Sequence, residues 1–302
     1  MKKLINFLLC SLCIIGCGGV EPTPIHPIPT PPTPTPPSTE EVPVSLQTRA
    51  ASGDFVKGDA IGIYMSNQVE GAHSPLKSSG NYIDNWRFEY DGDGGWSAGQ
   101  KLYYKDEETA ADFYAYYPYS TVSDATRYDV SVSADQSQES VYQNADFLWG
   151  SALACKPTTA PVEITLDHMM SKAVIILKPG TGFSEEELVA VNPSVILTGL
   201  NCEASFNLGT GELRSGNSVS DITPYHYSSL EYRAMVVPQE INDKDMVVIA
   251  IGESVYKLCR TISFEKGKEY TFTVTIQRTE GGVSVGIGSW DVVGEDFGGV
   301  VS

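Results

Sequence analysis

Basic residues are scarce in this chain of 302 residues. Twenty Lys and Arg stand against 38 Asp and Glu, which gives a formal net charge of −18. A chain this acidic has no broad electrostatic attraction to a phosphate backbone, so we exclude nucleic acid as a partner. Anionic lipid would repel it in the same way, and attachment to a membrane surface therefore requires a separate anchor.

The short motifs of the common catalytic sites are also missing. The sequence contains no G-x-S-x-G, H-E-x-x-H or G-x-x-x-x-G-K-[ST] motif, and none of its four histidines has another His or a Cys at metal-ligand spacing. Asp91 and Asp93 begin like a calcium loop, but Leu102 stands where that loop needs Glu, so a glycine-rich turn is predicted. His168, beside an apolar strand, is predicted to be a hydrogen-bonded structural residue. We predict no enzyme activity, no metal and no cofactor.

No hydrophobic run is long enough to cross a bilayer. Lys2 and Lys3 precede an uncharged stretch at 4–16, whereas a membrane-spanning helix needs roughly 20 residues. This pattern is typical of a secretory signal peptide, here residues 1–16. The stretch ends in Ile14-Ile15-Gly16-Cys17, which resembles a bacterial lipobox. We therefore predict cleavage between Gly16 and Cys17, acylation of the Cys17 thiol, and an outer-membrane lipoprotein anchored in lipid at the cell surface.

Cysteine is too sparse after this leader to build a disulfide scaffold. Three of the six cysteines lie within the first 17 residues, which leaves Cys155, Cys202 and Cys259. Cys202 shares one face of an alternating run with Phe206, which is typical of a small buried residue. No disulfide is expected.

Proline, by contrast, is concentrated in one segment. Residues 21–43 hold ten of the chain's 18 prolines. Proline removes backbone donors and favours extended polyproline II. Residues 17–49 are therefore predicted to be a lipidated, semi-rigid linker that ends in a short strand. A lipid, a spacer and a globular body together are typical of a surface-displayed lipoprotein.

From residue 50 onward the sequence alternates as strands do. A period of two with one apolar face predicts mainly antiparallel sheets with one solvated face. The predicted fold class is all-β, and because about 250 residues exceed one small sandwich, we predict two sandwiches, 50–158 and 159–302, divided near Pro157–Pro161. One helix is predicted at 184–191, begun by Ser184. The predicted strands include 60–65, 101–105, 112–117, 128–133, 162–166, 173–177 and 270–276.

Five pieces of sequence, in order, carry a resemblance to a known family. They are Thr48-Arg49-Ala50 with Gly58–Tyr64, Asp146–Gly150, Leu166–Val174, Ala204–Gly211 with Val236–Gln239, and Gly267–Tyr270 with Trp290. Within the third piece, His168 to Lys172 is similar to the family's H-x-M-[SA]-K segment. Together these pieces make the chain resemble the fimbrillin-like proteins, the pilus subunits of Bacteroides-type bacteria.

The resemblance implies a fold and a series of maturation and assembly steps. The implied fold is two transthyretin-like antiparallel β-sandwich domains, in agreement with the strand pattern. The implied history is a lipidated precursor, trimming by an arginine-specific protease, and polymerisation with other pilus subunits by strand donation, for adhesion to a host or bacterial surface receptor. The unusual proline content of residues 18–43 leaves open whether the chain forms the stalk, the tip or the base of a fimbrium.

Arg49 and Ala50 flank the bond at which this trimming is predicted. Val42, Val44, Leu46 and Thr48 alternate as a first strand would. Removing that strand would leave a groove of unpaired backbone groups that is a template for another strand. The alternative is that Arg49 is only a basic residue at the end of a linker.

The C-terminal tail contains a candidate donor strand. After the alternating Val283, Val285 and Ile287, residues 290–301 are apolar and rich in glycine, with no proline to block pairing. The predicted inward anchors are Trp290, Val292, Phe297 and Val300. The alternative is that this tail completes its own C-terminal sheet.

A second function also fits a lipobox, a spacer and β-sandwiches. The chain would then be a surface-tethered glycan-binding lipoprotein of a nutrient-uptake system. That function requires an exposed aromatic platform, for which Trp86, Trp96 and Tyr103 are the candidates. Aromatic cross-strand pairs are the commoner explanation of such residues.

Overall fold

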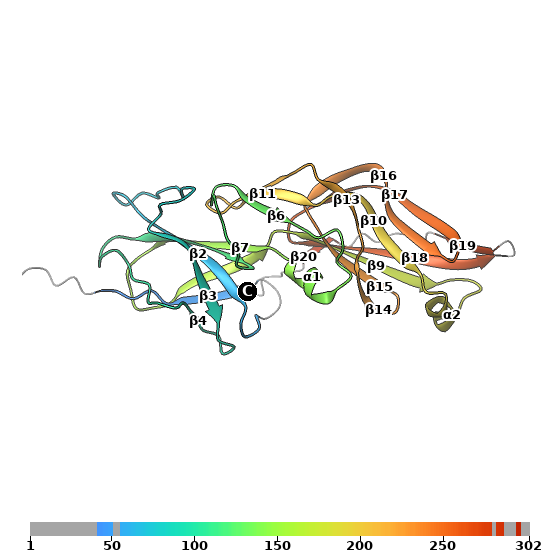
Figure 1. Ribbon diagram of the computed structural model, residues 1–302, viewed down its shortest axis with the longest axis horizontal. Helices are drawn as coiled ribbons and strands as arrows, with labels where there is room; N and C mark the ends of the chain where they lie inside the picture. The colour runs from blue at the N-terminus through green and yellow to red at the C-terminus, as the bar shows by residue number, and fades with distance from the viewer. Residues whose placement is uncertain (1–40, 51–54, 280–281, 287–293, 297–302) are drawn as a thin grey trace, which may run out of the picture. The chain divides into compact units, whose positions relative to one another are not determined.

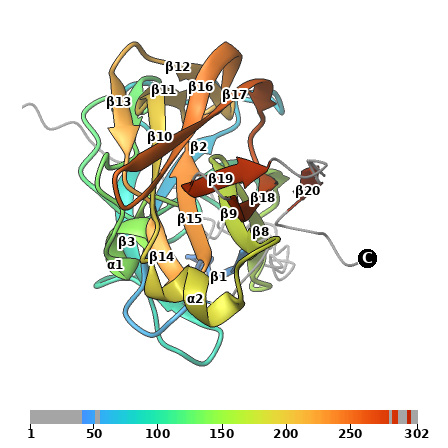
Figure 2. The same ribbon diagram turned by 90° about the vertical axis from the view of Figure 1, so that its right-hand side faces the viewer.

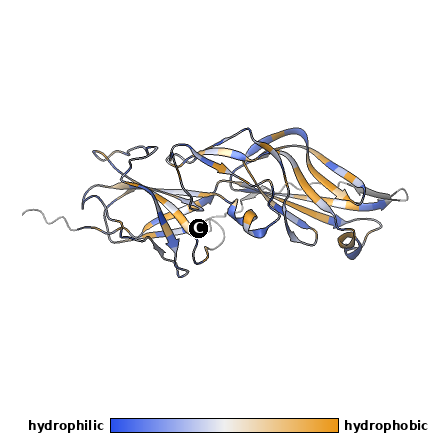
Figure 3. Ribbon diagram, viewed as in Figure 1, coloured by the Kyte–Doolittle hydropathy of each residue, from blue (hydrophilic) through white to orange (hydrophobic). Residues whose placement is uncertain are grey.

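The computed structural model describes residues 41–50, 55–279, 282–286 and 294–296. Within these residues the regular secondary structure is almost entirely β-strand, with two short helices (Figure 1). Hydrophobic and hydrophilic residues alternate along many of the strands (Figure 3). Because successive side chains of a strand point to opposite faces, this alternation buries one face of a sheet and exposes the other. The predicted all-β fold is confirmed.

The first sheet is built mainly from the N-terminal half of the described chain. Its strands are, in spatial order, β1 (Leu46–Ala50), β8 (Val162–His168), β7 (Leu148–Cys155), β5 (Ala111–Tyr117), β2 (Ala60–Asn67), β3 (Ile83–Tyr90) and β4 (Trp96–Ser97). The central strands β2 and β5 are buried on both faces. Ile63 and Phe113 pack into one core, and Tyr64 and Tyr114 pack into a second. These two strands are therefore continuous apolar runs rather than alternating ones.

Strand β8 follows the predicted domain boundary at 158/159, yet it pairs with β1 and β7 in this first sheet. By strand pairing, the change from the first sheet to the next therefore lies after His168. The division of the chain into two domains stays a prediction.

Two further sheets face each other across the second core (Figure 2). Ile175 and Phe272 of one sheet and Leu197 and Ile249 of the other belong to this core. One sheet holds β14 (Tyr225–Ser228), β15 (Glu231–Val236), β9 (Ser171–Pro179), β18 (Lys268–Thr279) and β19 (Gly282–Gly286), with β20 (Gly294–Asp296) also paired to β18. The other holds β13 (Val219–Ile222), β10 (Ser194–Asn201), β16 (Gln239–Ile251) and β17 (Ser254–Phe264).

A small three-stranded sheet ties the first sheet to this sandwich. It contains β12 (Glu212–Ser215), β11 (Glu203–Asn207) and β6 (Tyr128–Ser131). Phe147 and Phe206 meet edge to face with ring centroids 5.0 Å apart. The Trp149 indole N–H from β7 donates to the Leu208 carbonyl at 2.8 Å. Aromatic packing and one partly buried hydrogen bond therefore join segments that lie far apart in the sequence.

The helices show where local sequence signals succeed and fail. Helix α2 (Glu185–Ala190) begins after Ser184, whose hydroxyl accepts from the Glu187 N–H in a capping box, so the predicted helix is confirmed. Helix α1 (Glu139–Asn144) was not predicted, because its six residues bury only Tyr142 and show no helical periodicity. The strand predicted at 101–105 is wrong: the segment forms a single isolated bridge, between Tyr103 and Pro43.

Candidate functional site

Strand β1 is the edge strand of the first sheet and contains the Arg49–Ala50 bond. Leu46 and Thr48 point into the core, at 6% and 7% exposure, while Gln47 and Arg49 point to solvent. The strand pairs with β8 in parallel, and its other edge carries no strand among the described residues. An edge strand with one buried face is the geometry that allows one strand to replace another.

The Arg49 side chain is held only loosely. Its guanidinium nitrogen lies 3.8 Å from a Glu163 carboxylate oxygen, and both side chains are more than two-thirds exposed. Exposed ion pairs of this kind contribute little to stability. The side chain is therefore open to recognition from solvent, whereas the backbone of Arg49 lies beside Thr165 in the sheet. Hydrolysis of this backbone requires β1 to detach locally from β8.

The Thr48 hydroxyl group is not satisfied by the protein around it. Its hydroxyl oxygen is buried and has no hydrogen-bond partner in the described structure. A buried polar group without a partner costs about 1–3 kcal/mol. Parallel pairing is also slightly less stable per residue than antiparallel pairing. Strand β1 is therefore bound less tightly than its buried Leu46 alone would suggest.

The residues just before β1 pair with a different part of the chain. The Val44 N–H donates to the Leu102 carbonyl at 2.8 Å, and the Tyr104 N–H donates to the Val42 carbonyl at 3.0 Å. Val42 and Val44 also pack against the first core. Removing the chain up to Arg49 would therefore uncover the edge of β8 and the backbone at 102–104 together.

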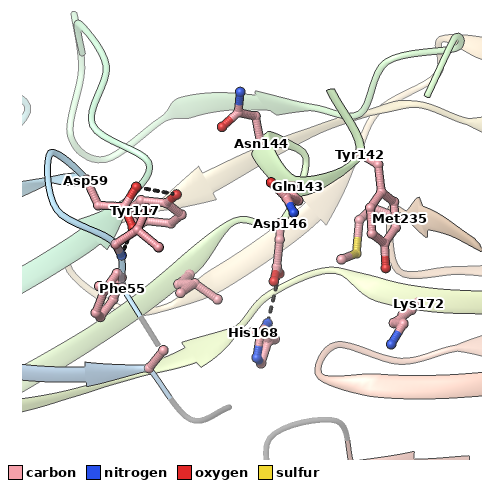
Figure 4. A pocket seen from close by; sticks show the side chains of 13 residues that line it. Phe55, Asp59, Tyr117, Tyr142, Gln143, Asn144, Asp146, His168, Lys172 and Met235 are labelled. Atoms are coloured by element: carbon pink, nitrogen blue, oxygen red, sulfur yellow. Dashed lines mark hydrogen bonds and ion pairs between the residues drawn. The ribbon is translucent and has the colours of Figure 1, made fainter. Parts of the chain in front are cut away.

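A cavity of about 430 Å³ lies at the C-terminal end of β1 (Figure 4), and we call it the β1 cavity. Side chains from several strands and from α1 converge on it, and Ala50, the last residue of β1, forms part of its wall. It is lined by Ala50, Phe55, Val56, Asp59, Tyr117, Tyr142, Gln143, Asn144, Asp146, Leu148, His168, Lys172 and Met235.

Two carboxylates in the β1 cavity carry hydrogen bonds (Figure 4). The Asp146 Oδ1 atom lies 2.8 Å from the His168 Nδ1 atom, so the prediction of a hydrogen-bonded His168 is confirmed. The Tyr117 hydroxyl donates to Asp59 at 3.3 Å. Burial, with the nearby Asp59 charge, raises the pKa of Tyr117 to about 12, which keeps this phenol protonated as a donor.

Sequence reasoning did not assemble this cavity, although a signal was present. Asp59, Asp146 and Lys172 were not singled out as site residues. Each of them lies in one of the sequence pieces that resemble the fimbrillin-like proteins, as does His168. The matching pieces therefore meet in space although they are separate in the chain.

The remaining predicted site residues fall in different places. Gly16 and Cys17 lie outside the described residues, as do the four predicted anchors of the donor strand, Trp290, Val292, Phe297 and Val300. Between those anchors, β20 pairs in antiparallel fashion with β18 of its own chain. That pairing is the alternative arrangement in which the tail completes its own sheet.

None of the three candidates for the aromatic platform of the glycan-binding alternative is an exposed side chain. Trp96 is only 9% exposed and packs against Phe55, with ring centroids 5.0 Å apart. Trp86 and Tyr103 are partly buried. The Asp91 carboxylate accepts from the N–H groups of Asp93 and Gly95, which is the predicted glycine-rich turn.

The described part of the chain contains neither a metal-binding cluster nor a membrane-spanning helix. Among the residues that the structure describes, no group of three or more His, Cys, Asp and Glu side chains is placed to hold a metal ion. Neither described helix has the length and apolar character of a bilayer span.

Comparison with known proteins gives a consistent result. The model of a family described as fimbrillin-like matches residues 48–290. A Bacteroides uniformis protein named "Putative fimbrium subunit Fim1C" is 26% identical over 263 residues, covering 82% of each chain. A Bacteroides ovatus protein named "Putative fimbrium tip subunit Fim1C" is 27% identical over 232 residues, which is 71% of this chain but 39% of that protein.

Solved structures show the same fold. A "putative cell adhesion protein" from Bacteroides uniformis superposes with a TM-score of 0.66 at 23% identity, covering 84% of this chain and 98% of that one. A second "putative cell adhesion protein", from Bacteroides ovatus, superposes with a TM-score of 0.62 at 17% identity, covering 85% and 100%.

Proposed function

The chain belongs to the fimbrillin-like family, and from this we propose that it is a structural subunit of a cell-surface fimbrium that contributes to adhesion. The observation that carries the proposal is the family match over residues 48–290, supported by a relative of similar length named as a fimbrium subunit. Its partners are then other pilus subunits, and its role is structural rather than catalytic.

Export as a lipoprotein is the first step of the proposed history. The lipobox that ends at Cys17 supports it, because two or three acyl chains make membrane anchoring stable whereas one chain is marginal. Replacing Cys17 by Ala should abolish incorporation of labelled palmitate. Equal labelling of the wild type and Cys17→Ala would contradict this step.

Cleavage after Arg49 by an arginine-specific protease is the second step. The exposed Arg49 side chain, its position in an edge strand and the unpartnered Thr48 hydroxyl support it. Protein recovered from surface filaments should begin at Ala50, as read by N-terminal sequencing. The matched control is Arg49→Lys, which keeps the charge but removes the arginine. Filament protein that begins only at Cys17 would refute the maturation.

Strand donation is the third step. The slot vacated by β1 offers unpaired backbone groups beside a hydrophobic floor, and an extended tail of the next subunit supplies the missing partner. Because this contact joins head to tail and does not close, it builds an open filament rather than a ring. The donor is the tail 290–301, which has to leave its own chain, where Gly294–Asp296 pairs with β18.

Deleting residues 291–302 tests the donor directly. The truncated protein, cleaved after Arg49, should form no filaments under negative-stain microscopy, whereas the cleaved full-length protein should. Filaments of equal number and length from both proteins would show that the tail is not the donor.

A further inference from the structure

The Arg49–Ala50 bond opens directly onto the β1 cavity, because Ala50 is part of the cavity wall. Hydrolysis of this bond breaks the C–N bond. The hydroxyl of water goes to the Arg49 carbonyl carbon and the remaining proton of that water goes to the Ala50 nitrogen. The resulting amine then takes up the proton that the new carboxylic acid releases. The product is a carboxylate on Arg49 and an α-ammonium group on Ala50, since an α-amine is largely protonated near neutral pH.

This new amino group cannot travel far. Four residues separate Ala50 from Phe55, and Phe55 is anchored between Trp96 and Tyr117, with ring centroids at 5.0 and 5.5 Å. An extended residue spans at most about 3.6 Å, so the amine stays within about 18 Å of Phe55. A tether this short gives the cavity a high effective concentration of the amine.

The charges of the β1 cavity favour a cation. Its acidic groups are Asp59 and Asp146, and its basic group Lys172 is already paired with Glu269 at 2.7 Å. His168 faces Asp146. The two phenols, Tyr117 and Tyr142, have pKa values raised by burial and remain neutral. The cavity is therefore richer in negative than in uncompensated positive charge.

Of the two carboxylates, Asp146 is the better placed to bind a cation. Asp59 already accepts hydrogen bonds at both oxygens, from the Val56 N–H at 2.8 Å and from the Tyr117 hydroxyl. Along β8, Ala50 lies level with Leu166, only two residues before His168, the partner of Asp146. Because Ala50, Asp146 and His168 line the same cavity, the Asp146–His168 pair is within reach of the freed Ala50 amine.

We infer that the β1 cavity binds the α-ammonium group of Ala50 once Arg49 has been cleaved, with Asp146 as its counter-ion. The inference rests on the cleavage proposed above. It adds a role for the new terminus. The register of β1 with β8 ends at Leu166, before His168. An amine bound beside His168 therefore leaves residues 162–166 of β8 clear for an incoming strand. The cavity thus couples processing to the exposure of the acceptor edge.

The test generates the Ala50 terminus without relying on the natural protease. Leu46→Ile, Gln47→Glu and Thr48→Gly place Ile-Glu-Gly before Arg49 in the full chain, and factor Xa then cuts after Arg49. The pKa of the Ala50 α-amine is measured from the pH dependence of its acetylation rate, read by mass spectrometry. It should lie about one unit or more above the ordinary value of about 7.7–8.0, because a close carboxylate favours the charged form.

Two substitutions locate the counter-ion. In Asp146→Asn the α-amine pKa should return to its ordinary range, whereas in Asp59→Asn, the control in the same cavity, the raised pKa should persist. If the Ala50 α-amine has an ordinary pKa in the cleaved protein that keeps Asp146 and Asp59, the inference is overturned. This outcome does not depend on whether the Asp146 and Asp59 variants fold. A raised pKa that survives Asp146→Asn would overturn the assignment. If cells never cleave Arg49, the proposed maturation fails while this measurement still gives its own answer.

Discussion

Two short edge strands, β1 and β14, are held to their sheets in opposite ways. On β14, Tyr225 stacks on Tyr142 with ring centroids 5.5 Å apart and an interplanar angle of 21°. The Arg233 guanidinium from the neighbouring strand lies 3.2 Å from the centroid of the Tyr227 ring. Aromatic stacking and a cation–π contact therefore fasten an edge of only four residues.

Among the described contacts, strand β1 has no aromatic stacking or cation–π contact of this kind. Its outward Arg49 makes a long, exposed ion pair with Glu163, and its inward Thr48 leaves a hydroxyl unpartnered. Both strands have backbone pairing, so the difference lies in their side chains. The comparison teaches that a permanent edge is fixed by side-chain packing, whereas an edge that is to be exchanged can rely on a ladder of backbone bonds and a modest buried face.

The largest effect is expected from Tyr142→Ala, which removes the ring beneath Tyr225. Tyr142 is only 8% exposed, and truncating a buried aromatic residue lowers the free energy of unfolding by about 3–5 kcal/mol. Urea denaturation would measure the loss. Tyr82→Ala, at a side chain 43% exposed, is the control and should change little. A loss below about 1 kcal/mol for Tyr142→Ala would show that β14 is held by its backbone alone.

The next effect is expected from Arg233→Met, which removes both the cation over Tyr227 and the ion pair with Glu231. That pair is about one-quarter exposed, with an N–O distance of 2.6 Å. The expected loss is about 1–2 kcal/mol, with faster amide hydrogen exchange in β14. Arg214→Met is a matched control, because Arg214 pairs with Glu212 at the same spacing but with a side chain 73% exposed. Equal losses in the two variants would contradict the role of the aromatic contact.

A smaller effect of opposite sign is expected from Thr48→Val. Replacing the buried, unpartnered hydroxyl by a methyl group of similar volume should raise the free energy of unfolding of the uncleaved chain by about 1 kcal/mol. It should also slow proteolysis after Arg49, because β1 would detach less often. Thr165→Val, at an exposed position on β8, controls for strand propensity. Cleavage at an unchanged rate in Thr48→Val would mean that the unpartnered hydroxyl does not loosen β1.

The smallest effect is expected from Glu163→Gln. The ion pair with Arg49 is long and exposed on both sides, so its removal should change the free energy of unfolding by less than about 0.5 kcal/mol. Thermal melts at low and high salt would measure this. A larger, salt-dependent loss of unfolding free energy would show that the Arg49–Glu163 ion pair does hold β1 in the sheet.

Much of the fold could be predicted because its signals are local. Alternation predicted strands at 128–133, 162–166 and 270–276, and the Ser184 cap predicted α2. Local signals failed where a segment is short or its pairing is long-range. The strand predicted at 101–105 became a single bridge to Pro43, and α1 has no periodicity to find. The candidate site was predicted only as the bond at Arg49, without the cavity beside it.

The sequence by itself determined the acidic charge, the concentration of proline in residues 21–43, the all-β class and the alternation that makes residues 46–50 a strand. Only the tertiary structure decided that this strand pairs in parallel with β8, that Thr48 is buried without a partner, and that Asp59, Asp146 and His168 meet at the end of β1. The physical reason is that periodicity and capping act within a few residues. Pairing between distant segments depends instead on closing long loops and on which side chains fill the space between sheets.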